Sequence, residues 1–316
     1  MTFAEKVAKN MAKSMKKHDE KHKSGKPLPK GAEVREYAYL PDGHEMHKLN
    51  VYRPKDVNGV LPLIIDIHGG AWIYGDKDLN KGMCMYLAAQ GYCVVGMSYR
   101  LIPEVTLEDQ VRDIFDSLHF IARHAREWGA DTSHVMLTGD SAGGHLSSLS
   151  LCICLSARLR EIYGVTAPEM HFDCLVMSHP VCEVHSIMRA KDFSPSPHFA
   201  WFQREFEPLL FGSDPGSSKI YNFASFTQYS RGLTLPPVMI IGCERDVYGK
   251  HSKFLSAYIE KMVREGRCKR FVFDYIDKAS ERDKLCHVYE VMYPDLPDSQ
   301  RALTAALDFF CESMKD

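Results

Sequence analysis

Short runs of apolar residues recur along the chain, separated by longer segments with helical spacing. Four of them are continuous: Leu63-Ile64-Ile65, Val94-Val95, Val135-Met136-Leu137 and Val238-Met239-Ile240-Ile241. Continuous apolar runs of this length are typical of strands buried on both faces of a parallel sheet. Counting the weaker signals, we expect strands at residues 33–40, 47–53, 62–67, 92–97, 134–138, 174–179, 237–242 and 270–276.

Amphipathic segments with helical spacing fill most of the intervals between these strands. We expect helices at about residues 80–90, 105–127, 142–158, 248–264 and 299–314. Strands that alternate with helices predict an α/β domain with a mostly parallel sheet. The first two strands are an exception, because the turn signal Pro41-Asp42-Gly43-His44 joins them directly. We therefore expect that pair to be antiparallel.

The N-terminal segment has a pattern of its own. Thr2 and Glu5 have the spacing of a capping box, which marks the start of a helix. Apolar residues then recur every four positions, at Phe3, Val7, Met11 and Met15. This spacing predicts an amphipathic helix with a thin apolar stripe, ending before the breaker Gly25-Lys26-Pro27.

Charge is unevenly distributed between this segment and the rest of the chain. Residues 1–30 hold nine Lys and three acidic residues, a net charge of 9 − 3 = +6, and the remainder carries −2 − 6 = −8. The whole-chain charge of −2 indicates no nucleic-acid partner. A basic helix can dock on an anionic membrane, although a solvated lysine face is the simpler interpretation. His18 and His22 are spaced i,i+4, but no third ligand accompanies them, and we predict no metal.

Composition narrows the class of protein. The hydrophobic fraction of 45% and charged fraction of 25% are ordinary for a globular protein and exclude a wholly disordered or collagen-like chain. No apolar run approaches the roughly 18 to 20 residues of a membrane helix, so we expect no stable membrane insertion. The ten Cys form no C-x-x-C pair, and the N-terminus lacks the features of a secretory signal. These features predict reduced thiols and a cytoplasmic protein.

Residues 183–235 interrupt the alternation of strands and helices. This stretch of 53 residues contains ten aromatic side chains, about 19% against 11% for the whole chain. Such an insertion between two strands can line a substrate pocket or form a lid. It can equally bury its rings in a small core of its own, and the sequence does not separate the two.

The strongest chemical signal is a G-x-S-x-G motif within Gly139–Gly144. It follows an expected strand and opens an expected helix, which is the context of a nucleophile elbow. On such a sharp turn the hydroxyl of Ser141 projects into the active site. The N–H of the next residue, Ala142, is then directed at the oxyanion that forms during acyl transfer.

A second motif, His68-Gly69-Gly70-Ala71-Trp72, follows the strand expected at 62–67. Glycines allow the backbone to approach a substrate closely and to turn its N–H groups inward. We predict an oxyanion hole made by Gly69, Gly70 and Ala142. Each donor of this kind typically contributes about 10²–10³ in turnover.

Serine needs a base, and the base needs an orienting carboxylate. In a fold with a nucleophile elbow the chain order is Ser, acid, His. Asp246 follows the strand at 237–242 and His287 follows the strand at 270–276, so we predict these as acid and base, with Glu244 as the rival acid. The other histidines considered fit less well and are expected to pack or face solvent: His145, His179 and His251.

These motifs, with the run Tyr99-Arg100-Leu101, resemble the α/β-hydrolase fold over roughly residues 35–314. The resemblance is to the carboxylesterase branch similar to hormone-sensitive lipase. It implies an eight-stranded sheet in a catalytic domain at 33–316, with a helical cap from residues 1–32 and the insertion at about 183–235. Ala71 stands where that branch has a third Gly, and H-G-G-x-W also resembles bacterial feruloyl or acetyl esterases and arylformamidases.

The sequence thus predicts a serine carboxylesterase that acts on short- to medium-chain or aromatic esters without a metal or organic cofactor. Candidate substrate-binding residues are Trp72, Phe199, Trp201 and Phe202. An arylformamidase-like amide hydrolase, suggested by Trp72, is one alternative. A non-catalytic small-molecule receptor of the same fold is another, although retention of His287 argues against it. The expected partner is a small-molecule ester, and relatives of this fold often form homodimers.

Overall fold

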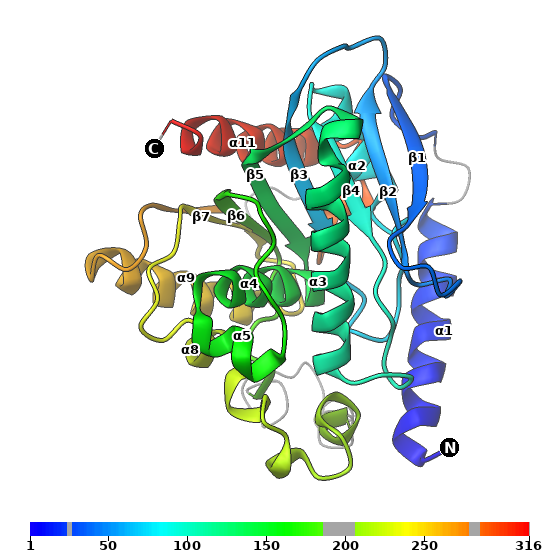
Figure 1. The fold of residues 1–316 in the computed structure, drawn as a ribbon, viewed down its shortest axis with the longest axis vertical. Coiled ribbons are helices and arrows are strands. Elements are labelled where there is room, and N and C mark those ends of the chain that lie inside the picture. The colour runs from blue at the N-terminus through cyan, green and yellow to red at the C-terminus, as the bar shows by residue number, and fades with distance from the viewer. Residues whose placement is uncertain (24–26, 186–205, 278–284, 316) are drawn as a thin grey trace.

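The computed structural model describes residues 1–23, 27–185, 206–277 and 285–315 (Figure 1). Its centre is one eight-stranded sheet with the strand order β1-β2-β4-β3-β5-β6-β7-β8. The strands are β1 (Ala32–Ala38), β2 (Lys48–Pro54), β3 (Leu61–Ile67), β4 (Cys93–Met97), β5 (Ala130–Asp140), β6 (Phe172–Ser178), β7 (Val238–Cys243) and β8 (Phe271–Ile276). β2 is antiparallel to β1 and β4, and the other pairs are parallel. The predicted strands, the mostly parallel sheet and the antiparallel first pair are confirmed.

Helices cover both faces of this sheet. They include α1 (Phe3–Lys23), α2 (Lys81–Ala89), α3 (Leu107–His124), α4 (Ala142–Leu155), α5 (Ala157–Tyr163), α8 (Phe226–Tyr229), α9 (Gly249–Arg264), α10 (Tyr289–Met292) and α11 (Pro297–Ser313). The helix predicted at 142–158 is two helices, because Ser156 leaves the helical backbone and its Oγ accepts the N–H of Leu159 to cap α5. The helix predicted at 105–127 ends as a 3₁₀ turn, which Gly129 terminates with a φ of 61°.

Alternation of side chains along each strand divides the interior into two cores. In β3, Leu63, Ile65 and Ile67 face the core beneath α3, α4 and α9, whereas Ile64 faces the core beneath α2 and α11. A strand with apolar residues at both parities must be covered on both sides. The continuous apolar runs therefore place these strands in the middle of a three-layer arrangement.

Side-chain contacts join the N-terminal helix to the rest of the chain. The N–H of Glu5 donates to Thr2 Oγ1 at 3.2 Å and the N–H of Thr2 donates to Glu5 Oε2 at 2.7 Å, which confirms the capping box. Further along α1, the hydroxyl of Tyr74 donates to Asp19 Oδ2 at 3.1 Å, and His22 Nδ1 lies 3.0 Å from the hydroxyl of Tyr293. The lysines of α1 at positions 6, 9, 13, 16, 17 and 21 are exposed. In the described part of the chain, no helix has both the length and the apolar character needed to cross a bilayer.

Candidate active site

Ser141 occupies a strained turn between β5 and α4. Its φ is 52° and its ψ is −116°, a conformation that side chains rarely adopt and that persists where the surroundings enforce it. The N–H of Ser141 donates to the carbonyl of Ser178 at 2.8 Å. A Cβ atom at Gly139 would collide with the carbonyl of Gly143, and one at Gly143 would collide with that of Ile67. The glycines of the motif are therefore required for the close packing of this turn.

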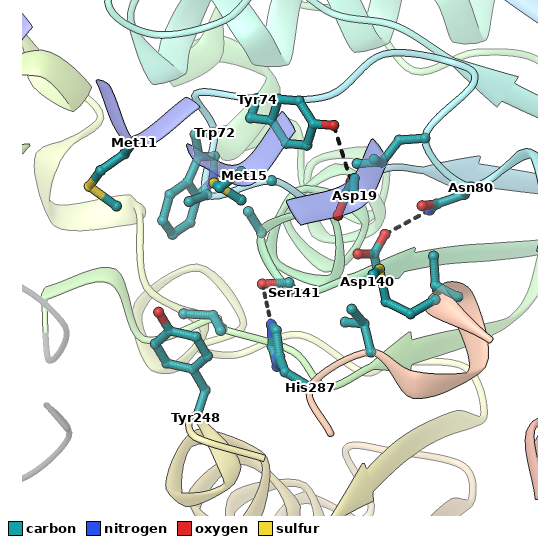
Figure 2. A pocket seen from close by; sticks show the side chains of 18 of the residues that line it. Met11, Met15, Asp19, Trp72, Tyr74, Asn80, Asp140, Ser141, Tyr248 and His287 are labelled. Atoms are coloured by element: carbon teal, nitrogen blue, oxygen red, sulfur yellow. Dashed lines mark hydrogen bonds between the residues drawn. The ribbon is translucent and has the colours of Figure 1, made fainter. Parts of the chain in front are cut away.

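His287 and Asp246 meet Ser141 in a hydrogen-bonded chain. The Nε2 atom of His287 lies 2.9 Å from Ser141 Oγ, and its Nδ1 lies 2.8 Å from Asp246 Oδ1 (Figure 2 shows the first contact). The short loop after β7 carries Asp246, and His287 lies two residues before the first residue of α10, Tyr289. The structure thus brings together the three residues that the sequence nominates, from three separate loops at one edge of the sheet.

The carboxylate of Asp246 is buried and held by several donors. Burial alone would raise its pKa, but His287 and His179 lower the pKa well below the ordinary value. The N–H of Tyr248 also donates to Oδ1, at 2.8 Å. Asp246 is consequently ionised at neutral pH and can orient an imidazole and balance its positive charge.

The rival acid and the other histidines have different partners. Glu244 accepts hydrogen bonds from Lys253, at 2.8 Å, and from the hydroxyl of Tyr275, rather than contacting His287. His145 accepts the indole N–H of Trp72 at 3.2 Å and lies 2.7 Å from the carbonyl of Ala224, so it is a core residue. Burial lowers the pKa of His145 to about 4, and the pKa of His251 also falls to about 4.

The glycine loop after β3 is fixed by a buried carboxylate. The N–H of Gly69 donates to Asp140 Oδ1 at 2.8 Å, and Asn80 Nδ2 donates to the same oxygen at 2.7 Å. We predicted that the N–H of Gly69 binds the oxyanion, but in the structure this N–H is already bonded to Asp140. Asp140, the residue before Ser141, instead ties the loop to the elbow, a link that the sequence did not reveal.

Three other N–H groups around Ser141 are available. Gly70, Ala71 and Ala142 line the same pocket as Ser141, and among the described residues their N–H groups have no acceptor. Gly70, Ala71 and Trp72 have φ values of 102°, 53° and 64°, so three consecutive residues of the loop have positive φ. A Cβ at Gly70 would collide with the carbonyl of Tyr74, which explains the glycine there.

A mostly apolar pocket opens above Ser141 and His287. Its volume is about 280 Å³. The walls include Met11 and Met15 of α1, with Trp72 and Tyr248 from the rest of the chain (Figure 2). Phe206 also lines the pocket. Of the apolar stripe of α1, Met11 and Met15 thus face the pocket, whereas Phe3 is exposed. Of the four candidate substrate-binding residues, Trp72 lines the pocket, whereas Phe199, Trp201 and Phe202 lie outside the described residues.

Within the described residues, one cluster has the spacing of metal ligands: His179, Asp246 and His287, whose ligand atoms lie within 4.8 Å of one another. Hydrogen bonds of 2.8 and 2.9 Å join both imidazoles directly to the carboxylate. A bound ion at its usual distance of about 2 Å from each ligand would have to break them. The arrangement is better explained by protons than by a metal.

Comparison with known families identifies the chain. Residues 49–258, about two thirds of its length, match the model of the BD-FAE family. The chain belongs to the BD-FAE family. The matched region includes the glycine loop, Ser141 and Asp246, whereas His287 lies beyond it.

Curated proteins similar to this BD-FAE member are esterases. A probable isoprenylcysteine alpha-carbonyl methylesterase of Arabidopsis thaliana is 33% identical over 109 residues, or 34% of this chain and 26% of that protein. The probable carboxylic ester hydrolase LipM of Mycobacterium tuberculosis is 36% identical over 125 residues, or 37% of this chain and 29% of that protein. The alignments thus span between a quarter and a third of these relatives.

Solved structures are similar over almost the whole chain. Esterase B of Lactobacillus rhamnosus superposes with a TM-score of 0.89 at 33% identity, covering 98% of this chain and 94% of the other. A bacterial heroin esterase superposes with a TM-score of 0.70 at 20% identity, covering 98% and 92%, which shows a shared fold. The α/β-hydrolase fold and the resemblance to carboxylesterases are confirmed for this BD-FAE member.

Two features of the site are not predicted by the sequence patterns. Asp140 is only the variable position of the G-x-S-x-G motif, and His179 precedes the acid in chain order. A signal for His179 is nevertheless present, because it is the last residue of the strand predicted at 174–179 and directly follows β6, and parallel strands end at one edge of the sheet. Side chains at such ends commonly belong to a site.

Proposed function

We propose that this chain is a serine carboxylesterase that hydrolyses short- to medium-chain or aromatic carboxylic esters. The hydrogen-bonded chain Ser141–His287–Asp246, which ends in an apolar pocket, is the observation that carries the proposal. Membership of the BD-FAE family and the similarity to Esterase B support the reaction class.

The geometry accounts for each step of an acyl transfer. Ser141 Oγ attacks the ester carbonyl while His287 Nε2 accepts its proton, and Asp246 stabilises the resulting imidazolium. We expect the N–H groups of Gly70, Ala71 and Ala142, which line the pocket beside Ser141, to bind the oxyanion. His287 then gives its proton to the departing alcohol. Water attacks the acyl-enzyme with the help of the same imidazole, which releases the acid and restores Ser141.

The pocket supports a substrate of moderate size. Esterase B has also been solved in a form inhibited with a C4-C4 SN3 tributyrin phosphonate. A volume of about 280 Å³ lined by methionine and aromatic side chains suits an acyl or aryl group of comparable bulk. We therefore expect p-nitrophenyl butyrate to be hydrolysed faster than the palmitate.

The test compares wild type with Ser141→Ala on p-nitrophenyl esters, on N-formylkynurenine and with a fluorophosphonate probe. Ester turnover and labelling that both vanish in Ser141→Ala support the proposal. Faster turnover of N-formylkynurenine would favour an arylformamidase. A wild-type protein that neither turns over nor labels would favour a receptor.

The cap, the compartment and the assembly belong to the same proposal. We assign residues 1–32 and about 183–235 to a cap over a catalytic domain at 33–316, supported by Met11, Met15 and Phe206 in the pocket wall. Ten free cysteines, seven of them buried, agree with the predicted cytoplasmic location.

Light scattering coupled to size exclusion measures whether the chain forms a homodimer. Co-sedimentation of wild type and of a variant lacking residues 1–23 with anionic vesicles tests membrane docking.

A further inference from the structure

A second histidine holds Asp246 from the side opposite His287. His179 Nδ1 lies 2.9 Å from Asp246 Oδ2, while His287 Nδ1 lies 2.8 Å from Oδ1. The side chain of His179 is completely buried, whereas that of His287 is 20% exposed. His179 is not part of the pocket wall, so it acts on the reaction through its neighbours Asp246 and His287, whose ring centroid lies 5.6 Å from its own.

The other nitrogen of this buried ring faces a second acid. His179 Nε2 lies 3.5 Å from Oε2 of Glu290, whose side chain is also completely buried. The hydroxyl of Ser178 donates to the other oxygen of Glu290. A neighbouring cavity lined by Ser178 and Glu290 measures about 10 Å³, which is at most the room for one water molecule. Glu290 therefore depends on His179 rather than on solvent for charge compensation.

Hydrogen-bonding capacity indicates which form His179 takes. A neutral imidazole carries one N–H and can present a proton to only one of the two buried carboxylates, whereas an imidazolium presents an N–H to each. Burial lowers the pKa of His179, but Glu290 and Asp246 outweigh it and raise the pKa to about 9. Burial likewise acts to raise the pKa of Glu290, and His179 reverses this and lowers it.

The backbone directs this ring toward Asp246 in a strained conformation. His179 has a φ of 46°, in the left-handed region. Its N–H donates to the carbonyl of Ile241 at 2.8 Å, which ties the strained residue to β7. The edge of Tyr289 packs against the ring with centroids 5.5 Å apart. Strain of this kind is retained where the surrounding structure enforces it, and it clusters at functional sites.

We propose that His179 is a positioning residue whose imidazolium offsets the buried charge of Glu290, so that the cluster beside His287 carries one net negative charge. Asp246, Glu290 and His179 sum to −1 − 1 + 1 = −1. Without His179 the sum is −2, which favours the protonated form of His287. A protonated His287 cannot take the proton of Ser141. This inference rests on the proposed roles of Ser141 and His287.

The other titratable groups around the cluster are the same in every protein of the comparison that tests this. Tyr248, whose ring packs on His287, has a pKa raised to about 12, and burial also raises the pKa of Cys286. On the far side, burial raises the pKa of Cys243 to about 12. Two further groups are common to every variant: Asp140, and His251, whose pKa is lowered to about 4. Tyr289 stays neutral because burial raises its pKa strongly.

The experiment measures the rate of fluorophosphonate labelling of Ser141 from pH 4.5 to 9 in four proteins. These are wild type, His179→Gln, Glu290→Gln and the double variant. We expect the acidic midpoint of the labelling rate to rise by roughly one to two pH units in His179→Gln, because the negative charge of Glu290 is then uncompensated about one ring away from His287. The double variant removes one charge of each sign, so its midpoint returns to the wild-type value. Glu290→Gln should not raise the midpoint.

The double variant separates charge balance from a loss of fit. Equal upward shifts in the single and double variants would show that the hydrogen bond matters rather than the charge, and would overturn the proposal. Identical midpoints in all four proteins would also overturn it. If His179→Gln does not fold, the other two variants decide. A raised midpoint in Glu290→Gln or in the double variant would overturn the proposal, and a wild-type midpoint in the double variant supports it. A wild-type Ser141 that never reacts would instead contradict the proposed esterase.

Discussion

The imidazole of His287 lies 2.9 Å from the hydroxyl of Ser141, although 146 positions separate the two residues in the chain. Ser141 is fixed by the turn between β5 and α4, and His287 by the start of α10. Their contact exists only when the sheet is complete, because β6, β7 and β8 follow β5 in both chain order and sheet order. Reactivity of Ser141 is consequently a sensitive report on the folding of this whole half of the molecule.

The acid can be tested against its rival. Asp246→Asn keeps the shape but removes the charge that favours the correct imidazole tautomer, and we expect kcat to fall by about 10⁴-fold. Glu244→Gln is the matched control, since Glu244 contacts Lys253 and Tyr275 instead, and its kcat should stay within about twofold. Steady-state kinetics on p-nitrophenyl butyrate decide the matter. A greater loss in the Glu244 variant than in the Asp246 variant would reverse the assignment.

The glycine loop provides a second test. Gly70→Ala would force a Cβ atom into the carbonyl of Tyr74 at a φ of 102°, and the resulting shift removes oxyanion donors. We expect kcat to fall by about 10²–10³-fold with a smaller change in KM. Gly216→Ala serves as the control because its Cβ would meet an atom only at 3.7 Å. Unchanged turnover in Gly70→Ala would exclude this loop from the reaction.

The length of acyl chain that the pocket accepts should depend on the size of the side chain at position 15. We expect Met15→Ala to shift the preferred acyl chain to a longer ester, and Met15→Trp to shift it to a shorter one, because this side chain lines the wall. Ser14→Ala, an exposed change on the same helix, is the control. The measurement is kcat/KM across p-nitrophenyl acetate, butyrate, hexanoate and octanoate. If the three variants share the wild-type chain-length profile, α1 does not limit the substrate.

A buried carboxyl group gives a stability prediction. Burial first, and then the nearby charge of Asp140, raise the pKa of Asp66 to about 8, against an ordinary value of about 4 when unfolded. Between these values the folded state holds a proton that the unfolded state has lost, so this group lowers stability as pH rises from about 4 to 8.

Asp66→Asn removes that proton linkage. We expect the stability of the variant relative to wild type to improve by a few kcal/mol between pH 5 and pH 8, the upper bound being about 3 units × 1.4 kcal/mol. Urea denaturation at both pH values measures the difference. A gap between the two proteins that does not change with pH would show that Asp66 ionises normally in the folded state.

Local sequence patterns predicted much of this structure because the spacing of apolar residues within a short segment indicates which of its faces are buried. The runs around Ile64 and Ile240 are typical of strands covered on both faces, and G-x-S-x-G between a strand and a helix is typical of a tight turn. The occupied N–H of Gly69 could not be predicted, since its acceptor Asp140 lies 71 positions away. The partnership of His179 with Asp246 likewise depends on two strands meeting side by side. The structure does not describe Phe199, Trp201 and Phe202, and their predicted contact with substrate stays a prediction.

The division of labour around the pocket has an evolutionary consequence. Helix α1 supplies wall residues such as Met11 and Met15 but none of the groups that make or break bonds. Replacements along residues 3–23 can therefore alter which molecules are accepted while the reactive groups stay untouched. Substitutions confined to this one helix would thus change the substrate range during evolution and leave the catalytic residues unchanged.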